Sequence, residues 1–218
     1  MNGIRPIIDN SLILILDPMN PKSYIGGSST WVDLSLYNND TTLNGTCVTE
    51  TNNLNNIVGI EMGTNDYGNF TSNDFIFGTS DFTLDFWIYP KSFAGYTHFI
   101  SIPTQNTFAL KADIASGAVY FYSPTWNIYP CGTLSLNSWN NVIFKRESSV
   151  GHGYLNGILM NSGINFTNNF TSNTINIHNG AGGEYNLCSM GVIKIYNRSL
   201  TNNEISINYN SMRNRYNI

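Results

Sequence analysis

The sequence predicts an all-β protein: an antiparallel β-sandwich with one short helix at its C-terminal end. Short apolar runs with a period of two recur along the chain, and Gly, Pro and Asn turn signals separate them. A helix-start signature appears in one place, after Leu200. Sandwiches often reach 218 residues as one unit, so we expect a single domain over residues 1–218.

The first element is expected at residues 12–16, where five apolar residues predict a fully buried strand. Pro18 and Pro21 end this strand, because proline cannot donate to a sheet ladder. Glycines then turn the chain toward Trp31, which we expect to plug one end of the sandwich.

Strand-like runs follow at regular spacing. They are 43–48, 57–62, 74–77, 82–89, 98–102, 107–111, 119–122, 139–145, 153–155, 174–178 and 192–197. The clearest is 82–89, where Phe82 and the alternate residues to Ile88 face one way and Thr83 to Tyr89 the other. The pair Asn156-Gly157 is typical of a type I′ hairpin turn.

The helix start carries two local signals. Thr201 and Glu204 form a capping box, in which each side chain accepts from the other residue's backbone amide. Leu200 and Ile205 occupy the positions of a hydrophobic staple. The helix is rich in Asn and has low propensity, so packing of Ile205, Tyr209 and Met212 must hold it.

Composition excludes several function classes. Charged residues make up 11% of the chain and the net charge is −4, which gives no footprint for nucleic acid. The apolar run at 12–16 is too short to cross a membrane. The three widely spaced cysteines, Cys47, Cys131 and Cys188, show no zinc pattern and are expected to be buried thiols.

The order of several motifs resembles laminin-G-like, concanavalin A-like jelly rolls, especially those in virion proteins of tailed phages. The motifs are N-P-K-S-Y at 20–24, T-W-x-D-L-S at 30–35, F-T-L-D-F-W-I-Y-P at 82–90, W-x-x-V at 139–142, Y-x-N-G at 154–157 and V-I-K-I-Y-N-R at 192–198. The resemblance covers nearly the whole chain. It implies a concanavalin A-like jelly roll and a virion protein, such as a head decoration, fibre or appendage module.

The resemblance also implies partners and a location. Other virion proteins and host cell-surface glycans are the expected partners, in an oligomer or a larger assembly. The expected location is the virion, assembled in the host cytoplasm, and neither nucleic acid nor membrane is expected as a partner.

Relatives with this fold include glucanases, which need two carboxylates on one strand. The glutamates of this chain, Glu50, Glu61, Glu147, Glu184 and Glu204, show no such pattern. Asp81 and Asp85 are four apart, but Asp81 falls in a turn, and His98, His152 and His178 lack a nucleophile setting. We therefore expect no enzyme. The alternatives are a glycan hydrolase or lyase with an unfamiliar site and a purely structural assembly subunit.

Sugar binding needs aromatic faces beside polar groups, and the chain supplies both. The candidate ligand-binding residues are Asp85, Trp87 and Tyr89 on one strand face, Tyr96 and His98 nearby, and Trp126 and Tyr129 in a loop expected between Pro124 and Pro130. The alternative is that these aromatics pack against a covering loop or a neighbouring subunit.

No cofactor is expected, although calcium is possible. The candidate ligands by composition are Asp66, Asn69, Asn73 and Asp74. The alternative is that these residues form Asx-turns, in which the side chain accepts from a nearby backbone amide.

Overall fold

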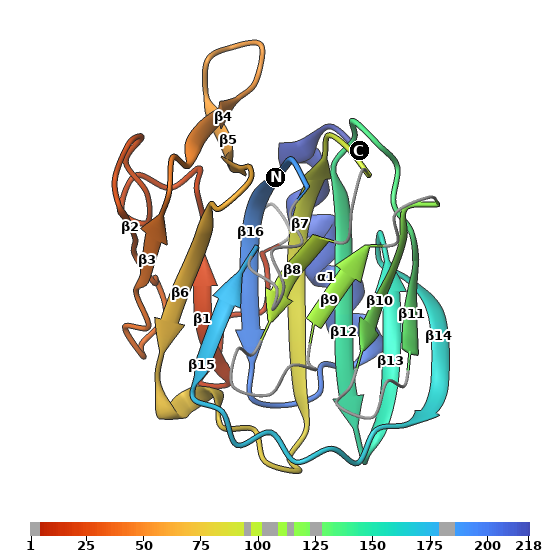
Figure 1. Ribbon diagram of the computed structural model, residues 1–218. Helices are drawn as coiled ribbons and strands as arrows, with labels where there is room; N and C mark the ends of the chain where they lie inside the picture. The colour runs from red at the N-terminus through yellow and green to blue at the C-terminus, as the bar shows by residue number, and fades with distance from the viewer. Residues whose placement is uncertain (1–4, 94–96, 102–108, 113–115, 123–127, 179–185) are drawn as a thin grey trace.

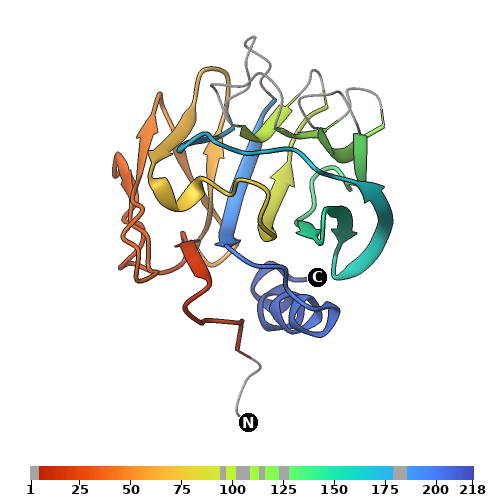
Figure 2. The same cartoon turned by 90° about the horizontal axis from the view of Figure 1, so that it is seen from below.

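Two antiparallel sheets face each other in the computed structural model, with one helix packed on the outside of the sandwich (Figures 1 and 2). The structure describes residues 5–93, 97–101, 109–112, 116–122, 128–178 and 186–218. Within these residues each sheet has eight strands. The predicted all-β sandwich with a C-terminal helix is therefore confirmed.

Sheet A carries the helix on its outer face. Its strands run in the order β14 (Ile158–Asn165), β13 (Val150–Leu155), β12 (Asn140–Glu147), β7 (Phe82–Pro90), β16 (Cys188–Tyr196), β5 (Ile57–Met62) and β4 (Val48–Thr51), and β1 (Leu12–Leu16) also pairs with β16.

Sheet B forms the front of the sandwich in Figure 1. Its strands run in the order β11 (Ile128–Thr133), β10 (Ala118–Tyr122), β9 (Ala109–Ala112), β8 (Thr97–Ser101), β15 (Thr174–Ile177), β6 (Tyr67–Thr71), β3 (Thr41–Asn44) and β2 (Thr30–Trp31).

The main core lies between the sheets, and the predicted alternation places it there. Phe82, Leu84, Phe86 and Ile88 of β7 all belong to this core, whereas Trp87 packs in a separate cluster on the outer face. Burial of such side chains is worth roughly 1.5–3 kcal/mol each, so this face of β7 is a main source of stability.

Other local predictions are also confirmed. β1 is fully buried, as its five apolar residues predicted. Trp31 is buried in the main core, and its expected position at one end of the sandwich stays a prediction. Asn156 and Gly157 have φ of 50° and 76°, as a type I′ turn requires, and they join β13 to β14.

Several expectations about local structure are wrong. The expected strand 43–48 is the end of β3 and the start of β4, separated by residues 45–47, and β6 was not predicted. Residues 74–77 are not a strand: Ser72 caps a 3₁₀ turn, η1 (Asn73–Phe75), by accepting from the Asp74 amide. The expected loop around Tyr129 is instead the strand β11. The edge strand β14 was not predicted, because its exposed sequence lacks a buried face.

The long strand β16 has a composite edge. Residues 188–190 pair with β5, whereas residues 193–196 pair with β1. The register with β7 on the other side shifts between Met190 and Ile193, so a bulge at Gly191 and Val192 marks the change of partner. This bulge frees the Val192 amide from the ladder.

The C-terminal helix α1 (Asn202–Met212) covers one half of the outer face of sheet A, and a 3₁₀ turn, η2 (Arg213–Tyr216), continues it. The capping box between Thr201 and Glu204 is present in both directions. Leu200 and Ile205 are buried in one cluster, so the staple is confirmed too. Arg198 donates to the Glu204 carboxylate, and this bond holds the pKa of Glu204 at about 2.

The cysteines are free thiols, as expected. Burial raises the pKa of Cys131 to about 12 and also raises that of Cys188, so both are unreactive side chains of the core. Cys47 is half-buried, and burial raises its pKa to about 11.

A candidate ligand groove on sheet A

The outer face of sheet A has a covered half, under α1, and an open half, where β7 ends and β16 begins. A cavity of about 760 Å³ opens over the open half. Three segments far apart in the sequence line it: the β4–β5 hairpin at 50–54, the turn at 137–139 and the C-terminal residues 214–218. Its volume lies within the range of about 300–1,000 Å³ that is usual for ligand sites.

Three aromatic side chains, Tyr89, Trp139 and Tyr216, line this cavity and form what we call the aromatic platform. The ring centroids of Trp139 and Tyr89 are 5.5 Å apart, and those of Trp139 and Tyr216 are 4.5 Å apart. Trp139 and Tyr89 are half-buried, whereas Tyr216 is buried. The platform therefore offers partly exposed aromatic surface that neighbouring rings hold in place.

Two strand glycines allow the platform to lie close to the sheet. A Cβ on Gly59 would come within 2.8 Å of the Trp139 ring. A Cβ on Gly191 would come within 2.5 Å of the Tyr216 hydroxyl and 2.9 Å of Trp139. The closeness of these contacts means that larger residues at either position would push the platform off the strands.

The β16 bulge fixes the platform from below. The freed Val192 amide donates to the Tyr216 hydroxyl oxygen at 2.8 Å. Burial of this hydroxyl raises the pKa of Tyr216, so it remains a neutral phenol. A backbone group that the bulge would leave unpaired thus becomes the anchor of η2.

A charged cluster lies beside the platform. Lys91 contacts the carboxylates of both Glu50 and Glu61, and the Ser189 hydroxyl donates to Glu50 Oε2 at 2.8 Å. Burial lowers the pKa of Lys91, but the hydrogen bonds that its ammonium donates to both carboxylates outweigh this effect and raise the pKa overall. Of these four residues, only Glu50 lines the cavity.

Among the described residues of the cavity wall, the other charged side chain is that of Arg215. Both of its terminal nitrogens bond to the Asp17 carboxylate, at 2.8 and 3.0 Å. This bidentate ion pair holds η2 against the loop after β1 and uses the terminal N–H donors of the guanidinium group.

Polar groups for a ligand come mainly from amides. The exposed asparagines of the cavity wall are Asn53, Asn137, Asn214 and Asn217. Asn137 and Asn217 have φ of 52° and 57°, a left-handed conformation that asparagine tolerates better than most residues. The turns thus display amide donors and acceptors in the wall of the cavity that the aromatic platform also lines.

Of the predicted ligand-binding residues, Tyr89 lines the cavity. Asp85 and Trp87 do not, and the prediction that these two residues bind a ligand is wrong, because both are buried beneath the C-terminal segment. Trp87 is stacked on Tyr216 at 4.4 Å and on Tyr209 at 5.9 Å. The alternative, that these aromatics pack under a covering segment, is confirmed for Trp87.

Asp85 belongs to a buried polar network. Its carboxylate accepts from Lys194 Nζ at 3.0 Å and from Asn141 Nδ2 at 2.7 Å. Asn208 of α1 also donates to it, at 3.2 Å. Lys194 and Asp85 have side-chain exposures of 0% and 1%, so this carboxylate has a structural role beneath the helix.

The remaining predicted residues do not meet at the cavity. Tyr129 is buried in the main core, where its ring packs edge-on against Phe166. His98 is a buried residue of β8 in sheet B, on the other sheet from the cavity. Tyr96 and Trp126 lie outside the described residues.

The candidate calcium ligands have local roles. Asp66 accepts from the backbone amides of Thr46 and Gly63, and Asp74 accepts from Ser72 and Asn39. Asn69 accepts from Asn44 across the sheet. Within the residues that the structure describes, no group of three or more His, Cys, Asp or Glu side chains is placed to hold a metal.

The sequence reasoning missed Trp139, Glu50 and the C-terminal turn. Trp139 was noted only as part of a strand motif, and Glu50 only as a lone acid. The available signal was Gly191, because a glycine inside a strand often marks the close approach of another group.

Comparison with protein families gives one match. A laminin G-type model of the concanavalin A-like lectin/glucanases superfamily matches residues 62–206. This segment includes Tyr89 and Trp139, whereas Glu50 and Arg215 lie outside it. None of the curated proteins matches the chain significantly.

Solved structures resemble the chain over most of its length. The binding domain of botulinum neurotoxin DC in complex with rat synaptotagmin II has a TM-score of 0.72 and 18% identity, over 94% of this chain and 52% of that one. The same domain in complex with SialylT has a TM-score of 0.69 and 17% identity, over 93% and 52%. The chain thus spans about half of these domains, and at this identity the likeness shows the fold alone.

Proposed function

The chain belongs to the concanavalin A-like lectin/glucanases superfamily, and we propose that it is a non-catalytic module that binds carbohydrate in the groove over sheet A. The observation that carries this proposal is the aromatic platform of Tyr89, Trp139 and Tyr216 inside a cavity of about 760 Å³.

The chemistry of the groove suits a sugar. The apolar face of a pyranose packs on an aromatic ring, and its hydroxyls need donors and acceptors around that ring. Trp139 supplies the ring, while amides such as Asn137 and Asn214 supply both kinds of hydrogen-bonding group. The hydrogen bonds of Glu50 within the described part of the chain all use Oε2, which leaves Oε1 as an acceptor for a hydroxyl.

The groove is also held in shape before a ligand arrives. The Arg215–Asp17 pair and the Val192–Tyr216 hydrogen bond fix the C-terminal wall and the floor. A preorganised site loses less entropy on binding, which matters for weak sugar contacts.

Titration calorimetry with neutral oligosaccharides tests the proposal. We expect binding to the wild type and a loss of about 10- to 100-fold in affinity for Trp139→Ala. The matched control is Tyr67→Ala, which removes a half-buried aromatic from sheet B. Equal affinities for wild type and Trp139→Ala would contradict the proposal.

One observation favours a second candidate, a glycan hydrolase. Glu50 and Glu61 lie on adjacent strands and contact the same ammonium, so their carboxylates are as close as a catalytic pair requires. However, Lys91 fills the space between them, where the bond to be cleaved would have to lie. Release of reducing sugar from a polysaccharide by the wild type, and its loss in Glu50→Gln, would establish this alternative.

The wider setting that we propose is the virion of a tailed phage, where the module would serve adhesion as a decoration, fibre or appendage. The support is the motif order at 20–24, 30–35 and 192–198. Mass spectrometry of purified particles from the source of this gene tests it. Detection at a fixed copy number is expected, and absence from the particles would contradict it.

A further inference from the structure

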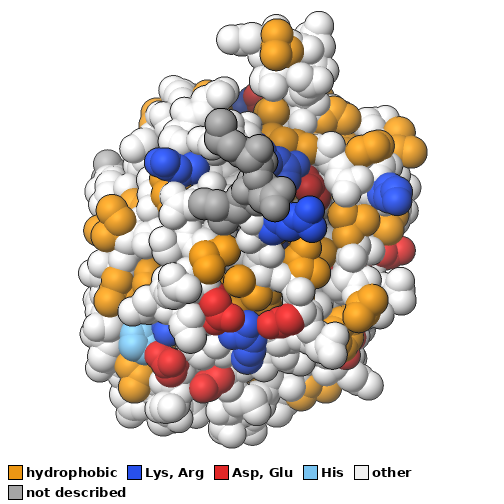
Figure 3. Space-filling model, turned by 180° about the vertical axis from the view of Figure 1, so that it is seen from behind, with side chains coloured by type: hydrophobic (Ala, Val, Ile, Leu, Met, Phe, Trp, Pro, Cys, Tyr) orange, Lys and Arg blue, Asp and Glu red, His pale blue; other side chains and the backbone are white. Residues whose placement is uncertain are grey.

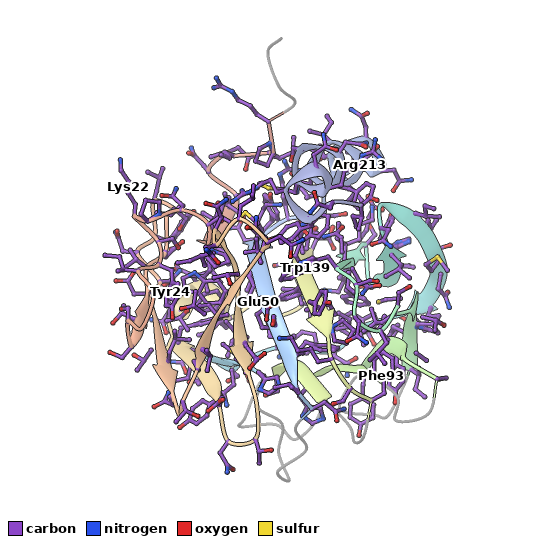
Figure 4. All side chains as sticks on the ribbon, turned by 90° about the horizontal axis from the view of Figure 1, so that it is seen from above. Lys22, Tyr24, Glu50, Phe93, Trp139 and Arg213 are labelled. Carbon is purple, nitrogen blue, oxygen red and sulfur yellow. The ribbon has the colours of Figure 1, made fainter. Side chains whose placement is uncertain are left out.

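A second cavity, of about 370 Å³, adjoins the first. The two share Asn52, Val58 and Arg215 in their walls, so they lie side by side, and we refer to them together as the groove. In the view from above, the labelled residues Trp139, Glu50 and Tyr24 lie in this order, from the first cavity toward the second (Figure 4). Adjacent cavities of about 760 and 370 Å³ have room for more than one sugar ring.

The two cavities differ in chemistry. The second is lined largely by apolar side chains, namely Pro18, Met19, Pro21, Tyr24, Ile57 and Val58. Its loop is firmly held, because Asn20 and Ser23 close successive backbone turns and Asp17 accepts from the Met19 amide. An apolar, rigid wall favours a methyl group over a hydroxyl, since a buried hydroxyl without a partner costs free energy.

The charges of the groove disfavour an acidic sugar. Among the described residues that line the two cavities, the charged side chains are Glu50 and Arg215. Arg215 is occupied by Asp17, and nearby Lys91 is shared by two glutamates. A ligand carboxylate would therefore meet Glu50 without a free cation to compensate.

We propose that this groove has two subsites and selects an uncharged oligosaccharide of at least two residues. One neutral ring lies on Trp139, and a neighbouring residue places a methyl-bearing substituent, either an N-acetyl or a 6-deoxy group, against Met19, Pro21 and Ile57. This inference rests on the proposed carbohydrate function and specifies its ligand class.

Calorimetry with four defined probes tests it: cellobiose, di-N-acetylchitobiose, 2′-fucosyllactose and 3′-sialyllactose. We expect at least one of the two neutral methyl-bearing probes to bind about 10-fold more tightly than cellobiose, and sialyllactose to bind about 10-fold more weakly than that probe. Tighter binding of di-N-acetylchitobiose would identify the methyl group as that of an N-acetyl substituent, and tighter binding of 2′-fucosyllactose would identify it as that of a 6-deoxy sugar.

Two variants separate the subsites. Ile57→Thr keeps the β-branched shape but replaces a methyl-bearing arm with a hydroxyl, so it should lower affinity for the methyl-bearing probe about 5-fold and leave cellobiose unchanged. Glu50→Gln should improve sialyllactose binding, because it removes the facing charge.

The outcomes are distinct. If the methyl-bearing probes bind no better than cellobiose, or sialyllactose binds as well as they do, the two-subsite inference is overturned and the carbohydrate function stands. If a panel that also includes larger neutral glycans shows no binding, the function itself fails and this inference fails with it.

Discussion

Trp87 and Tyr89 lie two residues apart on one face of β7, yet they occupy different environments. Trp87 is fully buried between Tyr209 and Tyr216, whereas Tyr89 is half-buried and lines the cavity. The strand is continuous across both, so the strand itself does not cause the difference. What separates them is the end of α1, which covers one half of sheet A and leaves the other open.

Similar side chains have different roles in the two halves. In the covered half, aromatic and polar groups anchor the helix. In the open half, the same residue types surround a space. Basic and acidic side chains are interspersed on the side of the molecule that carries α1 (Figure 3). Neither half of sheet A therefore lies in a broad electrostatic field of one sign.

The largest loss of stability is expected from a substitution in the covered half of sheet A. Trp87→Ala should reduce the free energy of unfolding by about 3–5 kcal/mol, because it leaves a cavity between two stacked tyrosines. Tyr89→Ala should cost about 1 kcal/mol. Urea unfolding measures both, and equal losses would contradict the division into two halves.

A similar contrast applies to the two lysines. Lys194→Met should cost at least about 3 kcal/mol, because it leaves the Asp85 carboxylate buried without its cation. Lys91→Met should cost about 1 kcal/mol, since the Lys91 side chain is 23% exposed and water screens its glutamates. A larger loss at Lys91 than at Lys194 would argue against the account.

Substitutions at two glycines, one beneath the aromatic platform and one away from it, test how closely the platform must lie on the sheet. Gly191→Ala should cost about 2 kcal/mol and weaken ligand binding, because its Cβ would overlap Tyr216 and Trp139. Gly63→Ala is the control: its Cβ would make ordinary contacts at 3.6 Å, and we expect a change below about 0.5 kcal/mol. Unchanged binding in Gly191→Ala would show that the platform tolerates displacement.

The smallest expected effect is on pH dependence. Arg198 holds the pKa of Glu204 at about 2, below its ordinary value of 4.5. A depressed carboxyl pKa adds stability above the ordinary value, and this stability is lost as the pH falls from 4.5 toward 2. Glu204→Gln should remove this part of the acid sensitivity, about 1 kcal/mol, in urea unfolding at about pH 7 and about pH 3.

Sequence reasoning succeeded where structure is set locally. The alternation of 82–89, the Asn156-Gly157 turn and the Thr201 capping box each depend on neighbours along the chain, and all three are confirmed. It failed where a segment distant in the sequence determines whether a side chain is buried or exposed. Nothing near Trp87 indicates that α1 will cover it, and β14 has no buried face to reveal it.

The groove shows the same limit. The walls of the first cavity come from 50–54, 137–139 and 214–218, and contacts such as that of Arg215 with Asp17, which no local pattern encodes, hold them in place. Tyr89 lines the cavity as a predicted candidate, which was chosen because it is an aromatic residue on the face of a strand. Trp139 was missed because it was interpreted only as part of a strand motif and not as a residue of the cavity wall.

The most direct test is to follow the tryptophan indole N–H signals by NMR during titration with a neutral oligosaccharide. We expect the Trp139 signal to shift in a saturable manner, while the Trp87 signal, beneath α1, moves little. A shift centred on Trp87, or binding that leaves the Trp139 signal in place, would contradict the account.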